Sequence, residues 1–232
     1  SITGFGCTVL AMPFVAMLIG LDAAVPVLLL QGWLLALLVV IESWRKIAWR
    51  EFAIIIVLMG IGIAPGVWMF SRLQADTLKL ILAVFTVAVG AEGLFRHFRR
   101  SAPAVTGPSS SRSRWLASLF LPLAGAIHGA FGTGGPLLVI YATRAIPDKS
   151  LFRVTLCLVW VVLNTVLVAQ KAAVGAMPPR VVILTAIAIP VSILGFWLGN
   201  KAHYRVNDVL FRRIVFVVLT AVGLFMGWSV LG

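Results

Sequence analysis

Charged side chains are scarce in this sequence of 232 residues, of which 11% are charged and 61% are apolar. Soluble domains carry about 25% charged residues, so this shortage excludes a soluble globular fold. The apolar content excludes a disordered chain as well. The stretches without any charge run to about 20 residues, which is the length of a helix that crosses a bilayer. The sequence therefore predicts an all-α, polytopic helical membrane protein.

Acidic residues and histidines are also few: there are 7 Asp and Glu and 3 His, against 19 Lys and Arg. The histidines lie far apart and the acids fall at the ends of apolar segments, so we expect no metal centre and no carboxylate-driven cation pump. No other cofactor is indicated. The basic residues lie between apolar segments, where the positive-inside rule puts them. The expected partner is therefore the lipid bilayer, and a nucleic acid is not expected.

Enzyme motifs are missing. The sequence has no GxSxG, no GxxxxGK[ST] and no CxxC, which disfavours a serine hydrolase, direct ATP drive and a thioredoxin-like redox protein. Cys7 and His128 form the one conceivable nucleophile–base pair, which would become adjacent if two helix breaks met at the bilayer midplane. An intramembrane enzyme is therefore the least favoured alternative.

Eight apolar segments are divided by one arginine-rich linker. We expect a first repeat at 1–95, a flexible basic linker on the cytoplasmic side at 96–114, and a second repeat at 115–232. The first residues resemble the middle of an apolar segment, so we expect that residues upstream of Ser1 are missing. The predicted segments are 4–20 (broken near Gly6 and Pro13), 23–42, 52–70, 78–95, 115–146 (interrupted at 132–136), 151–170, 181–200 and 212–231.

The two halves resemble each other. Three short matches recur in order at offsets of 126, 129 and 133 residues, which predicts an internal duplication. The matches are Phe5-Gly6 with Phe131-Gly132, Gly66-Val67-Trp68 with Gly195-Phe196-Trp197, and Ala88-Val89-Gly90 with Ala221-Val222-Gly223.

The distribution of basic residues predicts the topology. If all eight segments cross fully, Lys and Arg divide 10 to 9 between the two sides. If segment 115–146 is a hairpin that returns to its own side, they divide 15 to 4, as the positive-inside rule prefers. The second repeat is then inverted relative to the first, which is a recurrent plan of secondary transporters. By this symmetry each repeat starts with a glycine-broken helical hairpin.

The most informative motif runs from Gly129 to Pro136 and reads G-A-F-G-T-G-G-P. A helix broken within the membrane survives only when it is buried in protein or lines a cavity. The freed N–H groups and the positive end of the next half-helix favour an anion. The alternative is that these glycines only permit tight helix packing. Gly4-Phe5-Gly6 is a weaker counterpart in the first half.

With these motifs, the whole chain resembles the TauE/SafE sulfite exporter family. The resemblance implies export, or sometimes uptake, of sulfite, sulfonates and related small anions across a bacterial inner membrane. One departure is Cys7-Thr8, which stands where the family often has more glycines. A sulfur oxyanion or sulfonate is therefore the expected substrate.

We thus predict a secondary transporter that exports such an anion by alternating access, with the anion held at the glycine-rich breaks. A passive anion channel of the same architecture remains the main alternative. Polar residues within the apolar segments complete the candidate site, although the amides would equally serve helix–helix hydrogen bonding, the histidine could be a neutral core residue, and the arginine could be a positive-inside anchor. The candidate substrate-binding residues are Gly4, Gly6, Cys7, Thr8, Gln31, His128, Gly132, Thr133, Gly134, Gly135, Arg153 and Asn164.

Overall fold

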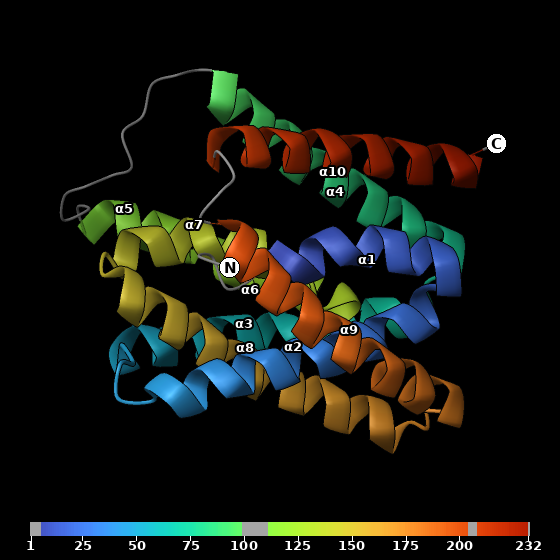
Figure 1. The fold of residues 1–232 in the computed structure, drawn as a ribbon, viewed down its shortest axis with the longest axis horizontal. Helices are drawn as coiled ribbons and strands as arrows, with labels where there is room; N and C mark the ends of the chain where they lie inside the picture. Colours follow the sequence, from blue (N-terminus) through green and yellow to red (C-terminus); the bar gives the residue numbers. More distant parts are fainter. Residues whose placement is uncertain (1–5, 99–110, 204–207, 232) are drawn as a thin grey trace.

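The computed structural model describes residues 6–98, 111–203 and 208–231, and the described residues form ten helices without a strand (Figure 1). Gly4 lies outside the described residues. The helices are α1 (Gly6–Ile19), α2 (Leu21–Ser43), α3 (Trp49–Arg72), α4 (Ala75–Phe98), α5 (Ser111–Ser118), α6 (Phe120–Phe131), α7 (Gly135–Ala145), α8 (Lys149–Ala173), α9 (Pro179–His203) and α10 (Asp208–Leu231).

Four of these helices, α2, α3, α4 and α8, are long and apolar enough to cross a membrane, and α9 and α10 each contain a shorter apolar stretch. Large apolar side chains are exposed on the outside of the bundle, including Ile61 on α3, Val191 on α9 and Trp228 on α10. In water such a surface would be unfavourable, whereas lipid tails are its natural solvent. The prediction of an all-α polytopic membrane protein is confirmed.

The predicted interruption of segment 115–146 is present. The chain enters along α5 and α6, turns after Phe131, and returns along α7, which packs against both. Figure 1 shows that the start of α5 and the connection after α7 lie at the same end of the bundle. The segment is therefore a hairpin that returns to its own side.

A break near Pro13 does not occur, and that prediction was wrong. Helix α1 runs without interruption from Gly6 to Ile19 with Pro13 inside it. Pro13 and its neighbour Met12 are both buried, and packing against other helices lets membrane helices tolerate a proline. The chain turns instead at Gly20, whose φ of 81° suits glycine.

Glycines set the closest helix contacts. A Cβ added at Gly66 of α3 would lie 2.1 Å from the Ala126 carbonyl oxygen of α6, and one added at Gly125 would lie 2.0 Å from the Met59 carbonyl oxygen. These two helices therefore touch backbone to backbone, which is how small residues drive helix association in lipid. The contact fixes the hairpin on α3.

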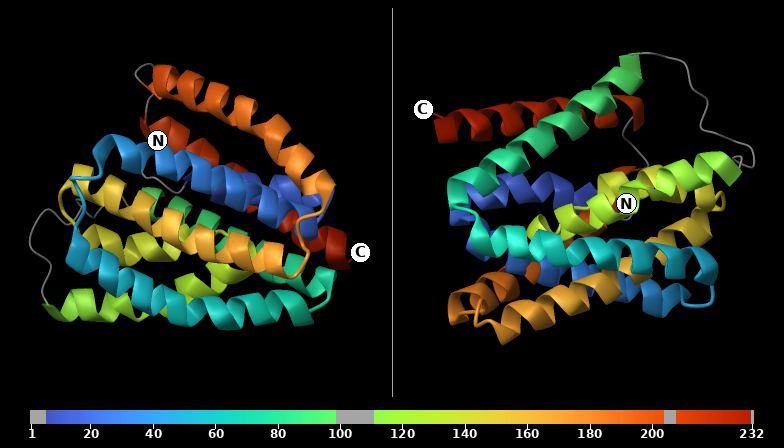
Figure 2. Two further views of the ribbon diagram at one scale, coloured as in Figure 1. Left: turned by 90° about the horizontal axis from the view of Figure 1, so that it is seen from below. Right: turned by 180° about the vertical axis from the view of Figure 1, so that it is seen from behind.

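Two pairs of helices that would correspond to each other in the two predicted repeats are in contact. Helix α2 packs on α8, and α4 packs on α10. Figure 2 shows α2 and α8 side by side and running in opposite directions, which an inverted repeat requires. The order of one short helix and three long ones also recurs, with 14, 23, 24 and 24 residues in α1 to α4 and 11, 25, 25 and 24 in α7 to α10. The inverted symmetry itself, and the division into repeats at 1–95 and 115–232, stay predictions.

The two ends of the bundle differ in charge. We call the end that holds the α2–α3 and α7–α8 connections the basic end, and the end that holds the turn at Gly20 and the α3–α4 and α8–α9 connections the opposite end (Figure 1). At the basic end, the described helix ends and connections carry Arg45, Lys46, Arg50, Arg114, Arg144, Lys149 and Arg153, and at the opposite end they carry Arg72, Lys79, Lys171 and Arg180.

Candidate functional site

The site starts at the break between α6 and α7. Gly132 ends α6 in the left-handed conformation, with a φ of 68°, and its N–H donates to the His128 carbonyl oxygen at 2.7 Å. Helix α7 begins at Gly135, and Pro136 occupies its first turn. Within the part of the chain that the structure describes, no side chain caps this N-terminus. Its first N–H groups therefore point at the break with the positive end of the helix dipole behind them.

Four buried side chains from three segments meet beside the break, and we call them the central polar cluster: His128 of α6, Thr133 of the break, and Trp160 and Asn164 of α8. Between 2% and 7% of each is exposed. His128 Nε2 lies 2.9 Å from Asn164 Oδ1, and the rings of His128 and Trp160 are 5.0 Å apart. The cluster thus ties the hairpin to α8.

The hydrogen bonds of Asn164 fix the protonation pattern of the neutral histidine. Asn164 Nδ2 donates to the Leu29 carbonyl oxygen of α2 at 3.4 Å, so Asn164 Oδ1 is left to accept. With this orientation of the amide, the neutral His128 donates from Nε2, and Nδ1 has the lone pair. This leaves Nδ1 as the one ring position that could take up a proton.

Three polar atoms of the cluster have no hydrogen-bond partner among the described residues. They are His128 Nδ1, Thr133 Oγ1 and Trp160 Nε1. Buried polar groups are nearly always paired, so unpaired ones in a membrane protein call for an explanation. The hydroxyl and the indole are donors, and a bound anion would satisfy both.

Packing explains two glycines of the Gly129–Pro136 motif. A Cβ added at Gly134 would lie 2.2 Å from the Ala124 carbonyl oxygen and 2.8 Å from His128 Cβ, although the backbone of Gly134 is ordinary α-helical. A Cβ added at Gly129 would lie 2.6 Å from the Ile63 carbonyl oxygen. The packing alternative therefore accounts for these positions, and Gly132 is required by its positive φ. Gly135, also buried, begins α7.

The first-half candidates lie at the start of α1. Gly6 and Cys7 open this helix, and their side-chain surroundings lie outside the described part of the chain. Thr8 is half-buried and lies near the cluster, because a Cβ added at Gly32 of α2 would be 3.7 Å from Thr8 Oγ1 and 3.4 Å from Asn164 Nδ2. Of these candidates, the structure places Thr8 beside the site.

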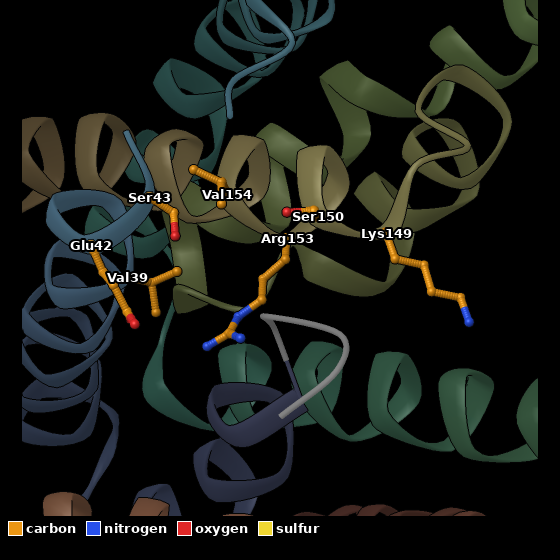
Figure 3. A pocket seen from close by; sticks show the side chains of 7 residues that line it. All are labelled: Val39, Glu42, Ser43, Lys149, Ser150, Arg153 and Val154. Carbon is orange, nitrogen blue, oxygen red and sulfur yellow. The ribbon is translucent and has the colours of Figure 1, made fainter. Parts of the chain in front are cut away.

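Gln31 and Arg153 lie apart from the cluster. The Gln31 Oε1 atom accepts a hydrogen bond from Ser192 Oγ at 3.1 Å, which links α2 to α9. Arg153 precedes Asn164 by eleven residues, or about 16 Å along α8. In Figure 3 its side chain extends away from α8, toward the side to which Glu42 and Lys149 also point. These side chains line a cavity of about 350 Å³ at the basic end, together with Val39, Ser43, Ser150 and Val154.

Sequence reasoning missed several partners. The Leu29 carbonyl is a backbone group without a sequence signal. Trp160 is not among the candidate residues predicted from the sequence. Tyr141 of α7 donates a hydrogen bond to the buried Glu51 of α3, which the sequence indicated only as an acid at a segment end. Thr155 of α8 accepts a hydrogen bond from the Ala48 N–H at 2.9 Å and so holds the start of α3.

Comparison with known proteins adds an independent line of evidence. A family model described as "Sulfite exporter TauE/SafE" matches residues 1–226. The chain is 25% identical over 183 residues to the "Probable inner membrane transporter protein TsaS" of Comamonas testosteroni, covering 78% of this chain and 73% of that protein. It is 27% identical over 187 residues to the "Probable sulfite/organosulfonate exporter TauE" of Cupriavidus necator, covering 77% and 68%. No solved structure matches the chain.

Proposed function

Because the chain belongs to the TauE/SafE sulfite exporter family, a family of membrane transporters and not of enzymes, we propose that it exports a small sulfur-containing anion. Sulfite or an organosulfonate fits the name of the Cupriavidus relative, and a bacterial inner membrane fits the name of the Comamonas relative. The observation that carries the proposal is the central polar cluster, which holds unpaired donors in a buried place beside an uncapped helix N-terminus.

The cluster suits an oxyanion in both shape and charge. Thr133 Oγ1 and Trp160 Nε1 each donate one hydrogen bond, and the first N–H groups of α7 donate more along the helix axis. No carboxylate belongs to the cluster, so an anion meets no like charge there. Sulfite and sulfonates present three oxygens to such a set of donors.

His128 supplies a route for coupling to protons. Its Nε2–H is engaged by Asn164, so a proton taken up at Nδ1 makes the ring a cation with a second donor. An anion bound beside the ring favours that proton through charge attraction. Anion and proton would then bind and leave together.

Alternating access requires that the anion be closed off from each side in turn. The cluster is closed off from solvent here, while the cavity with Arg153 and Lys149 opens at the basic end. We place that end in the cytoplasm by the positive-inside rule. The two cations of the cavity outnumber its one acid, Glu42, and so attract the anion before export. Rocking of the two repeats about the breaks would expose the cluster to either side. A passive channel of the same architecture would instead show flux that does not saturate.

The test is the replacement of Thr133 by valine, which keeps the shape of the side chain and removes its unpaired hydroxyl. We expect the affinity of the purified protein for sulfite to fall about tenfold, because one hydrogen bond to a charged ligand is lost. Calorimetric titration with sulfite, sulfate, sulfoacetate, taurine and chloride measures this. The matched control is Thr143→Val, since the exposed hydroxyl of Thr143 bonds only its own helix at Val139 O. Equal affinities in the two variants would count against the site.

A further inference from the structure

One face of α8 carries three features at regular spacing. An α-helix has 3.6 residues per turn, so residues 18 apart lie five full turns apart at the same angular position. Arg153 and Lys171 have this spacing, and Asn164 lies within about 20° of them on the helix wheel. Arg153 is at the basic end, Asn164 is in the central polar cluster, and Lys171 is at the opposite end. The two cations are about 27 Å apart along the helix.

Lys171 is buried in a way that a simple anchor would not be. Only 6% of it is exposed, and its Nζ atom lies 3.7 Å from the centre of the Phe70 ring of α3. Among the described residues, no carboxylate oxygen lies within 4 Å of Lys171 Nζ, and Asp22 of α2 acts on it through charge attraction over a longer distance. A lysine near a helix end usually extends to water, because a buried ammonium without a direct ion pair is unfavourable.

The contact that holds Lys171 in this conformation is one that an anion can replace. A cation over an aromatic face is held by a weak contact that an anion can replace. Helices α3 and α8, which carry Phe70 and Lys171, touch here, so their separation at this end would uncover the ammonium.

We propose that Lys171 is a second anion-binding cation of the transport path, an inference that rests on the proposed function. It serves the end opposite Arg153, and Phe70 covers it in this conformation. The anion passes from the basic end to the central polar cluster and then to Lys171 along one face of α8. When α3 and α8 part at the opposite end, the Nζ atom exchanges the Phe70 ring for a substrate oxygen.

The experiment compares sulfite transport from each side of the membrane in right-side-out and inside-out vesicles that contain the full chain. Lys171→Met keeps the length of the side chain and removes its charge, and Lys171→Arg keeps the charge. We expect Lys171→Met to raise the half-saturating sulfite concentration at the opposite end about tenfold, and at the basic end by less than about threefold. Lys171→Arg should stay within about threefold of the wild type at both ends.

Arg180→Met is the matched control, because it removes an exposed cation from the same end of the bundle. A Lys171→Met variant that behaves like Arg180→Met overturns the inference. Phe70→Leu gives a second test that leaves Lys171 in place: loss of the ring should lower the half-saturating concentration at the opposite end about threefold. An unchanged value contradicts the covering role. A wild type that neither binds nor moves a sulfur anion overturns the proposed function itself, which distinguishes the two failures.

Discussion

Replacing His128 by glutamine is expected to lower sulfite flux driven by a pH gradient about 100-fold, while exchange of sulfite for sulfite stays within about tenfold of the wild type. Glutamine can still donate a hydrogen bond to Asn164 Oδ1, but it cannot take up a proton at the position of Nδ1. Net coupled transport needs that proton, whereas exchange does not. Both fluxes are measured in proteoliposomes with labelled sulfite.

His97→Gln is the matched control for this prediction, because it removes a histidine from the last turn of α4 and leaves the central polar cluster unchanged. The two variants should differ strongly in gradient-driven flux. Equal fluxes in His128→Gln and His97→Gln would remove His128 from the coupling mechanism. Equal loss of exchange and of gradient-driven flux would instead assign His128 to substrate binding alone.

Replacing Gly134 by leucine is expected to have the largest effect on stability. The new Cβ would lie 2.2 Å from the backbone oxygen of Ala124, so the two arms of the hairpin must move apart. Overpacking of this kind costs about 3 kcal/mol, which corresponds to about 6–12 °C in Tm for a chain of this size. Thermal unfolding of the purified protein in detergent measures the shift, and sulfite affinity should fall with it.

Gly60→Leu is the control, because Gly60 is exposed on α3 and an added Cβ there meets nothing within 4 Å. Its Tm should stay near that of the wild type. A Gly134→Leu protein of normal Tm would show that the close contact between Gly134 and α6 is not what requires glycine. Gly134→Leu would disturb both helix packing and anion binding, so it tests only the structure of the hairpin. Thr133→Val is the variant that tests the anion site.

The sequence predicts those features that depend on local chemistry. The membrane class follows from charge-free runs, and the helix break follows from G-A-F-G-T-G-G-P, which combines a residue suited to positive φ with a proline that starts the next helix. His128 and Asn164 could be predicted as candidates because polar groups within the membrane are costly and need a reason. Their contact could not, since 36 residues separate them.

Features that depend on which helices pack against each other could not be predicted from the sequence. Gln31 and Thr8 both lie in apolar helices near a glycine, yet Gln31 bonds Ser192 of α9 while Thr8 lies beside Asn164. Arg153 shares α8 with Asn164, but the rise of the helix carries it to the other end of the path. The break predicted at Pro13 was wrong for the same reason. Packing against neighbouring helices maintains α1, and the local sequence does not reveal that packing.

The most direct test of the central claim uses the fluorescence of Trp160, whose indole N–H is one of the unpaired donors. Sulfite added to the purified protein should change the tryptophan emission in a saturable way, and chloride should not. The change should be lost in Trp160→Phe and kept in Trp228→Phe, since Trp228 is 77% exposed on α10. A sulfite response of equal size in both variants, or none in the wild type, would contradict binding at the central polar cluster.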